Sequence, residues 1–158
     1  MNLNESILSR FKISKSIELK NKILMAPMTR RFADTEFCPT PEMADYYAKR
    51  SDAGLIISEG TIISEDAIGY GNVPGIYTEK QISKWSKVTE KVHVNNGKIF
   101  LQLWHCGRAS HPKFHKGNLP VSCSETEMKL PLGKTGLIPG KCRAASLDRK
   151  STRLNSSH

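Results

Sequence analysis

Residues 98–105 place an amide and an aromatic ring inside a short apolar segment. In "KIFLQLWH", Gln102 interrupts a run of apolar side chains, and Trp104 and His105 close it. A primary amide presents a hydrogen-bond donor beside an acceptor, which suits the edge of a uracil-like ring such as the pyrimidine end of a flavin. Trp104 would give such a ligand an aromatic wall. Gln102 can equally be a satisfied core amide and Trp104 a packing residue, so both interpretations stay open.

Two earlier apolar segments also end in residues that can contact a flat ligand. One closes with Pro27 and Met28 and is followed by Thr29, which brings a hydroxyl group. The other closes with Glu59 and Gly60, and a glycine lets a ring approach the backbone closely. These residues would meet if the segments were neighbouring strands.

The three segments themselves, residues 22–28, 54–60 and 98–105, read as strands. Each is nearly continuous in apolar side chains, and polar residues come only near the carboxyl end. This composition is typical of a parallel sheet that is covered on both faces. Alternation along the third strand predicts that Gln102 and Trp104 lie on one face, and that Leu101 and Leu103 face the helices.

Helical patterns separate the strands. "TPEMADYYAKRSDAG" offers Thr40 as an N-cap and Pro41 in the first turn, and Gly54 is expected to end this helix. Its predicted buried face consists of Met43, Tyr46 and Tyr47.

"TEKQISKWSKVTEKVHVNNG" gives a second helix. Thr78 and Gln81 have the spacing of a capping box, and Asn95 to Gly97 are expected to end the helix. Its predicted buried stripe is Ile82, Trp85, Val88 and Val92.

Alternating strands and helices indicate an α/β protein built from βαβ units. The loops after the strands, 29–40 and 61–77, are long, which is typical of a (β/α)8 TIM barrel, whose active face is built from such loops. A doubly wound sheet is the alternative, but "APMTRRFADTE" after the first strand lacks the glycine-rich phosphate turn. We expect residues 1–145 to form the N-terminal part of a barrel, with about three strand–helix units, and 146–158 to be a disordered, non-native tail.

Composition narrows the classes of partner. The formal net charge is +9, but six of the 24 basic residues lie in 134–158, and the rest form no basic stripe with interleaved aromatic residues, so nucleic acid is not expected as a partner. The chain has no apolar run long enough to span a membrane and no secretion signal, which predicts a cytoplasmic protein without a membrane partner. The four cysteines, which form no CxxC pair, are expected to be free thiols.

One cluster of residues and one single carboxylate could also form sites. Cys106, His111, His115 and Cys123 hold soft ligands within one loop, but their spacing fits no common zinc pattern, so no metal is expected. Glu59 at a strand end could act as a general base. A structural carboxylate paired with Arg30 or Arg50 is the interpretation we favour.

Four segments of the sequence together resemble the Old Yellow Enzyme family of FMN-dependent ene-reductases, with its N-ethylmaleimide reductase branch nearest. They are "MAPMTR", "TPEMADYYAKRSDAGLIISEGT", "GYGNVPGIYTEKQISKW" and "GKIFLQLWHCGRASHP". The resemblance runs from about residue 10 to about residue 145. It implies a (β/α)8 barrel that binds FMN, takes hydride from NAD(P)H and reduces a small activated alkene.

The resemblance also implies roles for individual residues at the cofactor. Pro27 and Met28 would lie beneath the flavin, and Thr29 would hydrogen-bond near its C4 carbonyl. Gly60 would bring its backbone close to the ring, and Gln102 would pair with the pyrimidine edge.

The resemblance implies further that Tyr70 and Trp104 line the substrate pocket. The family's polarising His/His or His/Asn pair, its proton-donating Tyr and its phosphate-binding Arg would follow the end of this chain. The catalytic residues are therefore expected outside it, and the chain alone is expected to be inactive. The alternatives are a non-catalytic fragment that forms a homo-oligomer through exposed barrel edges, and another flavin-binding barrel oxidoreductase.

Overall fold

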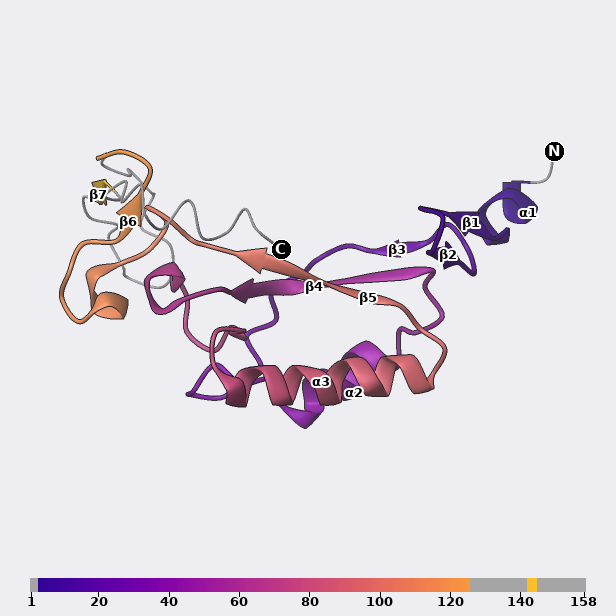
Figure 1. The fold of residues 1–158 in the computed structure, drawn as a ribbon, viewed down its shortest axis with the longest axis horizontal. Helices are drawn as coiled ribbons and strands as arrows, with labels where there is room; N and C mark the ends of the chain where they lie inside the picture. The colour runs from indigo at the N-terminus through magenta and orange to yellow at the C-terminus, as the bar shows by residue number, and fades with distance from the viewer. Residues whose placement is uncertain (1–2, 126–141, 145–158) are drawn as a thin grey trace. The chain divides into compact units, whose positions relative to one another are not determined.

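The three predicted strands form one parallel sheet in a computed structural model that describes residues 3–125 and 142–144 (Figure 1). The strands are β3 (Leu24–Met25), β4 (Leu55–Ile62) and β5 (Ile99–Trp104), in the order β3-β4-β5. Strand β3 is far shorter than predicted, and Pro27, which has no N–H to donate, lies two residues beyond it. Strand β4 extends two residues past Gly60. The tail expected at 146–158 lies outside the described residues.

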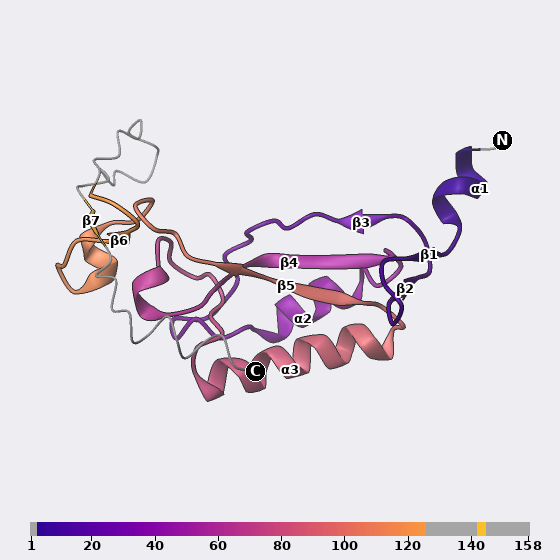
Figure 2. The ribbon, with the colours of Figure 1, turned by 45° about the horizontal axis from the view of Figure 1, so that its top comes forward.

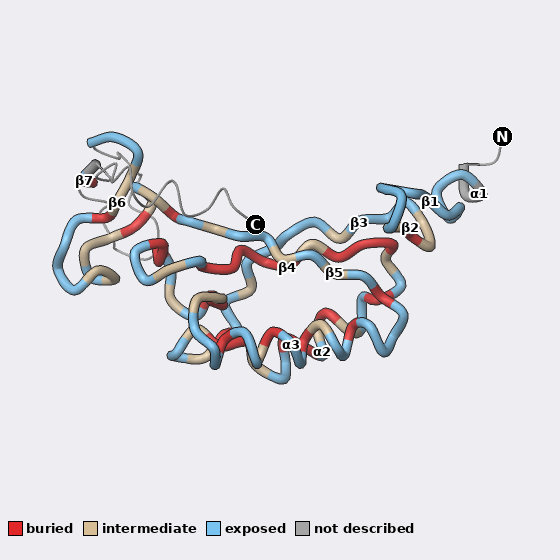
Figure 3. The backbone as a smooth tube through the Cα atoms, in the orientation of Figure 1, coloured by how far each residue is buried: buried red, intermediate tan, exposed pale blue. Residues whose placement is uncertain are grey.

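Two helices cover one face of this sheet. They are α2 (Pro41–Ala48) and α3 (Glu79–Val94), which lie side by side beneath β4 and β5 (Figures 1 and 2). The inward sides of the helices and most of β4 are buried, whereas the outward sides of the helices are exposed (Figure 3). The buried core residues come from both helices, β4 and one loop residue: Ala33, Met43, Ala44, Tyr47, Ile56, Trp85, Val88 and Val92.

Helix α2 starts where predicted but ends early. Pro41 opens it, yet the hydroxyl of Thr40 donates to the carbonyl of Phe32 at 3.0 Å and makes no cap to the helix. The helix ends at Ala48, and tight turns replace it up to Gly54. A Cβ at Gly54 would overlap the backbone carbonyl of Asn21, so this position requires glycine for close approach.

Helix α3 confirms the predicted capping box. The Thr78 hydroxyl accepts the N–H of Gln81, and the Gln81 side chain accepts the N–H of Thr78 in return. The predicted buried stripe is right for three of its residues but wrong for Ile82, which is 41% exposed. Gln81 is buried instead, because its amide also donates to the carbonyl of Glu36 at 3.1 Å.

The remaining elements are short. The chain begins with α1 (Leu3–Leu8) and an antiparallel pair, β1 (Phe11–Lys12) with β2 (Glu18–Leu19). The later ones are η1 (Glu65–Ala67), η2 (Pro112–His115) and the parallel pair β6 (Val121–Ser122) and β7 (Arg143–Ala144). None of the helices within the described ranges is long and apolar enough to cross a membrane.

The chain divides into two units. The first comprises residues 1–65 and 70–105 and contains the three-stranded sheet with its helices. The second comprises residues 66–69 and 106–158 and contains η2 and the β6–β7 pair. The residues predicted to contact a ligand all belong to the first unit.

Candidate functional site

Two polar side chains near the carboxyl ends of the sheet are exposed and make no hydrogen bond within the described residues. Thr29 follows β3, Gln102 lies on β5, and both residues are exposed. Among the described residues, neither the Thr29 hydroxyl nor the Gln102 amide has a hydrogen-bond partner. Pro27 and Met28, which precede Thr29, are exposed as well. The alternative that Gln102 is a satisfied core amide is therefore wrong for this structure.

Gly60 lies directly opposite Gln102 on the neighbouring strand. The ring that covers it here is the indole of Trp104: a Cβ at Gly60 would overlap Cε3 of Trp104 and lie 2.7 Å from Cδ2. The Trp104 ring also stacks on Tyr70, with centroids 5.5 Å apart and planes at 21°. Gly60, Trp104 and Tyr70 thus form one aromatic wall beside Gln102.

The two leucines that flank Gln102 behave differently. Leu101 packs against the helix core, as the alternation of side chains along β5 predicts. Leu103 was expected to face the helices too, but it is 66% exposed. It lies near the end of β5, an edge strand of the described sheet, where it is not covered.

Glu59 is a buried carboxylate with partners other than those expected. It is 1% exposed, and its Oε1 accepts the hydroxyl of Tyr47 at 3.2 Å while its Oε2 accepts the backbone N–H of Arg30 at 3.2 Å. The predicted pairing with an arginine guanidinium is wrong, since the guanidinium groups of Arg30 and Arg50 both lie over the ring of Tyr46, at 4.4 and 3.7 Å.

Burial raises the pKa of both groups of this pair, Glu59 and Tyr47. It raises the pKa of Glu59 above its usual value, and the hydrogen bonds from Arg30 and Tyr47 oppose that rise. The pKa of Tyr47 is raised too, first by burial and then by the charge of Glu59. A buried carboxylate behind the strand ends has no access to a substrate, which favours a structural role over that of a general base.

His111 and His115 make local hydrogen bonds within the second unit, and Cys106 is buried. His111 Nδ1 accepts the N–H of Lys113 at 3.1 Å, and His115 Nε2 lies 2.7 Å from Oγ of Ser110, which donates to the carbonyl of Ile68. Burial raises the pKa of the Cys106 thiol to about 11. Within residues 3–125 and 142–144, no three such side chains come together as a metal site.

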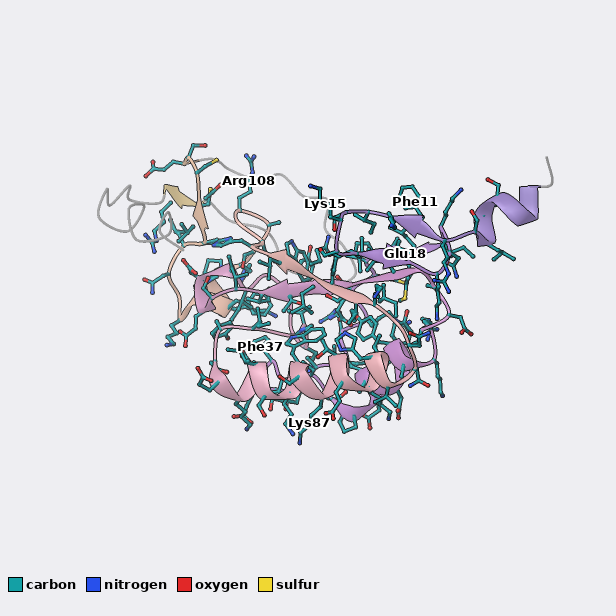
Figure 4. The ribbon with its side chains drawn as sticks, turned by 45° about the vertical axis from the view of Figure 1, so that its right-hand side comes forward. Phe11, Lys15, Glu18, Phe37, Lys87 and Arg108 are labelled. Atoms are coloured by element: carbon teal, nitrogen blue, oxygen red, sulfur yellow. The ribbon has the colours of Figure 1, made fainter. Side chains whose placement is uncertain are left out.

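A groove of about 240 Å³ lies between the two helices. Pro41 and Ala44 line it from α2, and Lys84 and Lys91 from α3. Lys91 is paired with Asp45, and Lys87 points from α3 away from the sheet (Figure 4). The groove contains none of the predicted ligand-contacting residues.

The sequence did not predict the hydrogen bonds of Tyr47 and Ser58. Tyr47 is predicted only as part of a buried helix face and Ser58 only as a residue near the carboxyl end of a strand. In the structure, Tyr47 bonds twice to Glu59, and Oγ of Ser58 accepts the N–H of Gln102 at 3.1 Å. The sequence carries no signal for these bonds, because periodicity marks Tyr47 only as part of a buried helix face and says nothing of its hydroxyl.

The chain is similar in sequence to a family of known proteins. Residues 7–139 match the profile of the NADH:flavin oxidoreductase / NADH oxidase family. 12-Oxophytodienoate reductase 7 of Oryza sativa subsp. japonica is 40% identical over 136 residues, which cover 81% of this chain and 34% of that protein. Flavin oxidoreductase hxnT of Emericella nidulans is 45% identical over 112 residues, which cover 68% of this chain and 29% of that protein.

Solved structures match the fold. The old yellow enzyme homologue from Zymomonas mobilis superposes with a TM-score of 0.84 at 38% identity, over 95% of this chain and 42% of that one. Morphinone reductase in complex with tetrahydroNAD gives 0.83 at 35% identity, over 94% and 43%. The chain thus spans about a third of the length of its curated relatives. These matches confirm the predicted (β/α)8 barrel, of which the chain carries the N-terminal part.

Proposed function

Since this chain belongs to the NADH:flavin oxidoreductase / NADH oxidase family, we propose that its first unit forms the ring side of an FMN site. One observation carries the proposal. Thr29 and Gln102 bring an unpartnered hydroxyl and amide to the carboxyl ends of β3 and β5, and Gly60 of β4, the strand between them, lies opposite Gln102. Ligands of α/β sheets bind at such strand ends.

The chemistry of these groups fits a flavin ring. The Gln102 amide donates and accepts side by side, as the N3–H and carbonyl groups of a pyrimidine edge require. The Thr29 hydroxyl would bond near the C4 carbonyl, and the exposed segment of Pro27 and Met28 would lie under the ring. Gly60 would contribute backbone contacts.

Tyr70 and Trp104 would bound the space for a substrate, since their stacked rings stand beside Gln102. FMN, when bound, supplies a centre that accepts and returns hydride. We propose NAD(P)H as the reductant and a small activated alkene as the substrate of the whole protein. The residues of this chain would orient the ring and shield one side of the pocket from water.

Ring binding can be tested apart from phosphate binding. The described residues are proposed to contact the ring only, so riboflavin and FMN should bind the chain with equal affinity. Without contacts to the phosphate, FMN should bind with a Kd of about micromolar or weaker. Amide shifts in ¹⁵N NMR titrations would report binding at Thr29, Gly60 and Gln102. Submicromolar FMN binding would contradict weak binding, and binding of FMN without riboflavin would indicate a phosphate attracted to the +9 chain instead.

Gln102→Leu is the decisive variant in these titrations. It removes the donor–acceptor pair and should weaken riboflavin binding roughly tenfold, the effect of about 1.4 kcal/mol. Glu90→Leu adds the same side chain at an exposed position of α3 and should leave the affinity unchanged. Equal affinity in both variants would argue against the assignment of Gln102.

Activity requires the rest of a barrel. We propose to join residues 1–125 to the C-terminal part of the Zymomonas mobilis homologue and to measure alkene-dependent oxidation of NADH and NADPH. The chimera should be active, and the 158-residue chain alone should be inactive. A chimera that retains FMN but reduces no alkene with either nucleotide would count against the proposed activity.

Self-association of the chain is a second proposal. Strand β5 is at the edge of the sheet within the described residues and exposes Phe100 and Leu103, and an edge with apolar side chains favours pairing with another copy. Light scattering after size exclusion should show oligomers that Leu103→Lys reduces. A monomer at every concentration would rule this out.

A further inference from the structure

An extra residue in β4 sets which residues of β4 and β5 face one another. Ile57 lies opposite Phe100, but the next matched pair is Gly60 opposite Gln102. Three steps along β4 therefore correspond to two along β5, which is a β-bulge at Ser58 and Glu59. Bulges near functional sites re-aim side chains, and this one brings Gly60 opposite Gln102.

Side chains bond to the backbone N–H and carbonyl of Glu59 in the bulge. Oγ of Ser58 accepts the N–H of Gln102 at 3.1 Å and donates to the carbonyl of Glu59 at 2.9 Å. The hydroxyl of Thr61 donates to the same carbonyl at 3.1 Å. The N–H of Glu59 donates to the hydroxyl of Tyr47 at 2.8 Å. The bulge is thus held from helix α2 and from its own hydroxyl groups.

The carboxylate of Glu59 extends this network to the loop after β3. Its Oε1 accepts the Tyr47 hydroxyl, and its Oε2 accepts the N–H of Arg30, the residue directly after Thr29. The N–H of Arg31 also stabilises the charged form. One buried carboxylate therefore connects α2, the bulge of β4 and the loop that carries Thr29.

We propose that Glu59 is a positioning residue that holds the Thr29 loop and the β4 bulge in fixed register with Gln102, without touching the ligand. This inference rests on the proposed FMN-ring site. Thr29, Gly60 and Gln102 come from three separate segments, and the described hydrogen bonds of Glu59, Tyr47 and Ser58 join those segments. A purely structural carboxylate would stabilise the fold but would not fix the loop selectively.

Glu59→Gln separates the two halves of the network. The amide oxygen of glutamine can still accept the Tyr47 hydroxyl, whereas its NH2 group would face the N–H of Arg30, donor against donor. The variant should therefore release the Thr29 loop while keeping the contact between α2 and β4. Tyr47→Phe, a second variant, keeps the carboxylate and removes its anchor on α2.

Val92→Ala is the control, because Val92 is buried in the helix core and has no contact in the network. The readouts are amide exchange and riboflavin titrations, both by NMR on the 158-residue chain. The variants are compared under conditions in which their free energies of unfolding are equal. Glu59→Gln should raise exchange at Arg30 and weaken riboflavin binding, each roughly tenfold, as loss of one buried hydrogen bond predicts. Tyr47→Phe should change both in the same direction, and Val92→Ala neither.

Two outcomes would overturn the inference in different ways. If the wild-type chain binds riboflavin but Glu59→Gln and Tyr47→Phe match Val92→Ala in exchange and affinity, the positioning role is wrong and the proposed function stands. If Gly60 and Gln102 show no riboflavin-dependent shifts in the wild type, the proposed function fails and the positioning role at that site fails with it.

Discussion

The hydroxyl of Tyr47 makes two hydrogen bonds to a single residue, Glu59: it accepts the backbone N–H at 2.8 Å and donates to Oε1 at 3.2 Å. Helix α2 is thereby bonded to β4 at the point where the strand bulges. Both side chains are 1% exposed, so water does not compete for these bonds. The site proposed at the strand ends depends on this buried pair behind it.

Stability should fall with rising pH because of Glu59. Its pKa is raised in the folded chain, so the folded state binds more protons than the unfolded state, whose glutamate titrates at about 4.3. The contribution is complete below the unfolded pKa and is lost as the pH rises through the folded pKa. Urea unfolding of wild type and Glu59→Gln from pH 4 upward should show the wild type losing stability relative to the variant.

The comparison with Glu59→Gln removes the effects of other titrating groups. Asp45, whose pKa is lowered by its hydrogen bond to Lys91, has the opposite dependence but is present in both proteins. A stability difference that stays constant across the pH range would contradict the raised pKa of Glu59.

Gly60→Ala should destabilise the chain by about 1–3 kcal/mol, since the added Cβ would overlap the ring of Trp104. Truncation of that ring in Gly60→Ala/Trp104→Ala should relieve the overlap, so the two changes should not add. Gly71→Ala is the matched control, because its Cβ would come no closer than 3.8 Å to another residue. Urea unfolding measures the free energy of unfolding of each variant. Equal losses of stability for Gly60→Ala and Gly71→Ala would contradict the close packing of Trp104 on Gly60.

Thr78→Ala should cost about 1 kcal/mol of stability, because it removes the hydroxyl that accepts the N–H of Gln81 at the start of α3. Thr78→Ser retains that acceptor and should stay within about 0.5 kcal/mol of wild type. Thermal unfolding of the three proteins checks the order, and an equal loss for serine and alanine would show that the methyl group, not the cap, matters.

Thiol labelling should distinguish the cysteines. Cys123 is exposed, whereas Cys38, Cys106 and Cys142 are buried, and burial raises the pKa of Cys106 to about 11. Because the thiolate is the reactive form, Cys123 should react with a disulfide reagent at pH 8 well before Cys106 does. Cys123→Ser should abolish the fast phase, and a fast phase that persists would place another thiol at the surface.

The sequence predicted the elements whose signals are local. The capping box of Thr78 and Gln81 and the apolar runs of β4 and β5 need only neighbouring residues to be recognised. The end of α2 and the exposure of Ile82 depend on tertiary contacts instead. The backbone of Asn21 approaches Gly54 so closely that only a glycine fits there. Gln81 is buried in place of Ile82, because its amide donates to the carbonyl of Glu36.

The candidate site, too, was predictable only where its signals are local in the sequence. Gln102 stood out because an amide interrupts an apolar strand, and its free, exposed side chain agrees with that signal. The partners of Glu59 were not readable, since periodicity marks Tyr47 as apolar and says nothing of its hydroxyl. The β4 bulge leaves no mark in the alternation of a strand that is buried nearly throughout.

Helix α2, which bonds to the bulge of β4, comes before β4 and β5 in the chain. The hydroxyl of Tyr47 is a partner of the bulged backbone, so we expect the segment from Ser58 to Ile62 to reach its register only after α2 has docked. Helix α2 precedes both strands in the chain, so on a ribosome it is made before the strands it locks. Refolding of Tyr47→Phe should therefore be slower than that of wild type in stopped-flow measurements, and an unchanged rate would place the docking of α2 after the rate-limiting step.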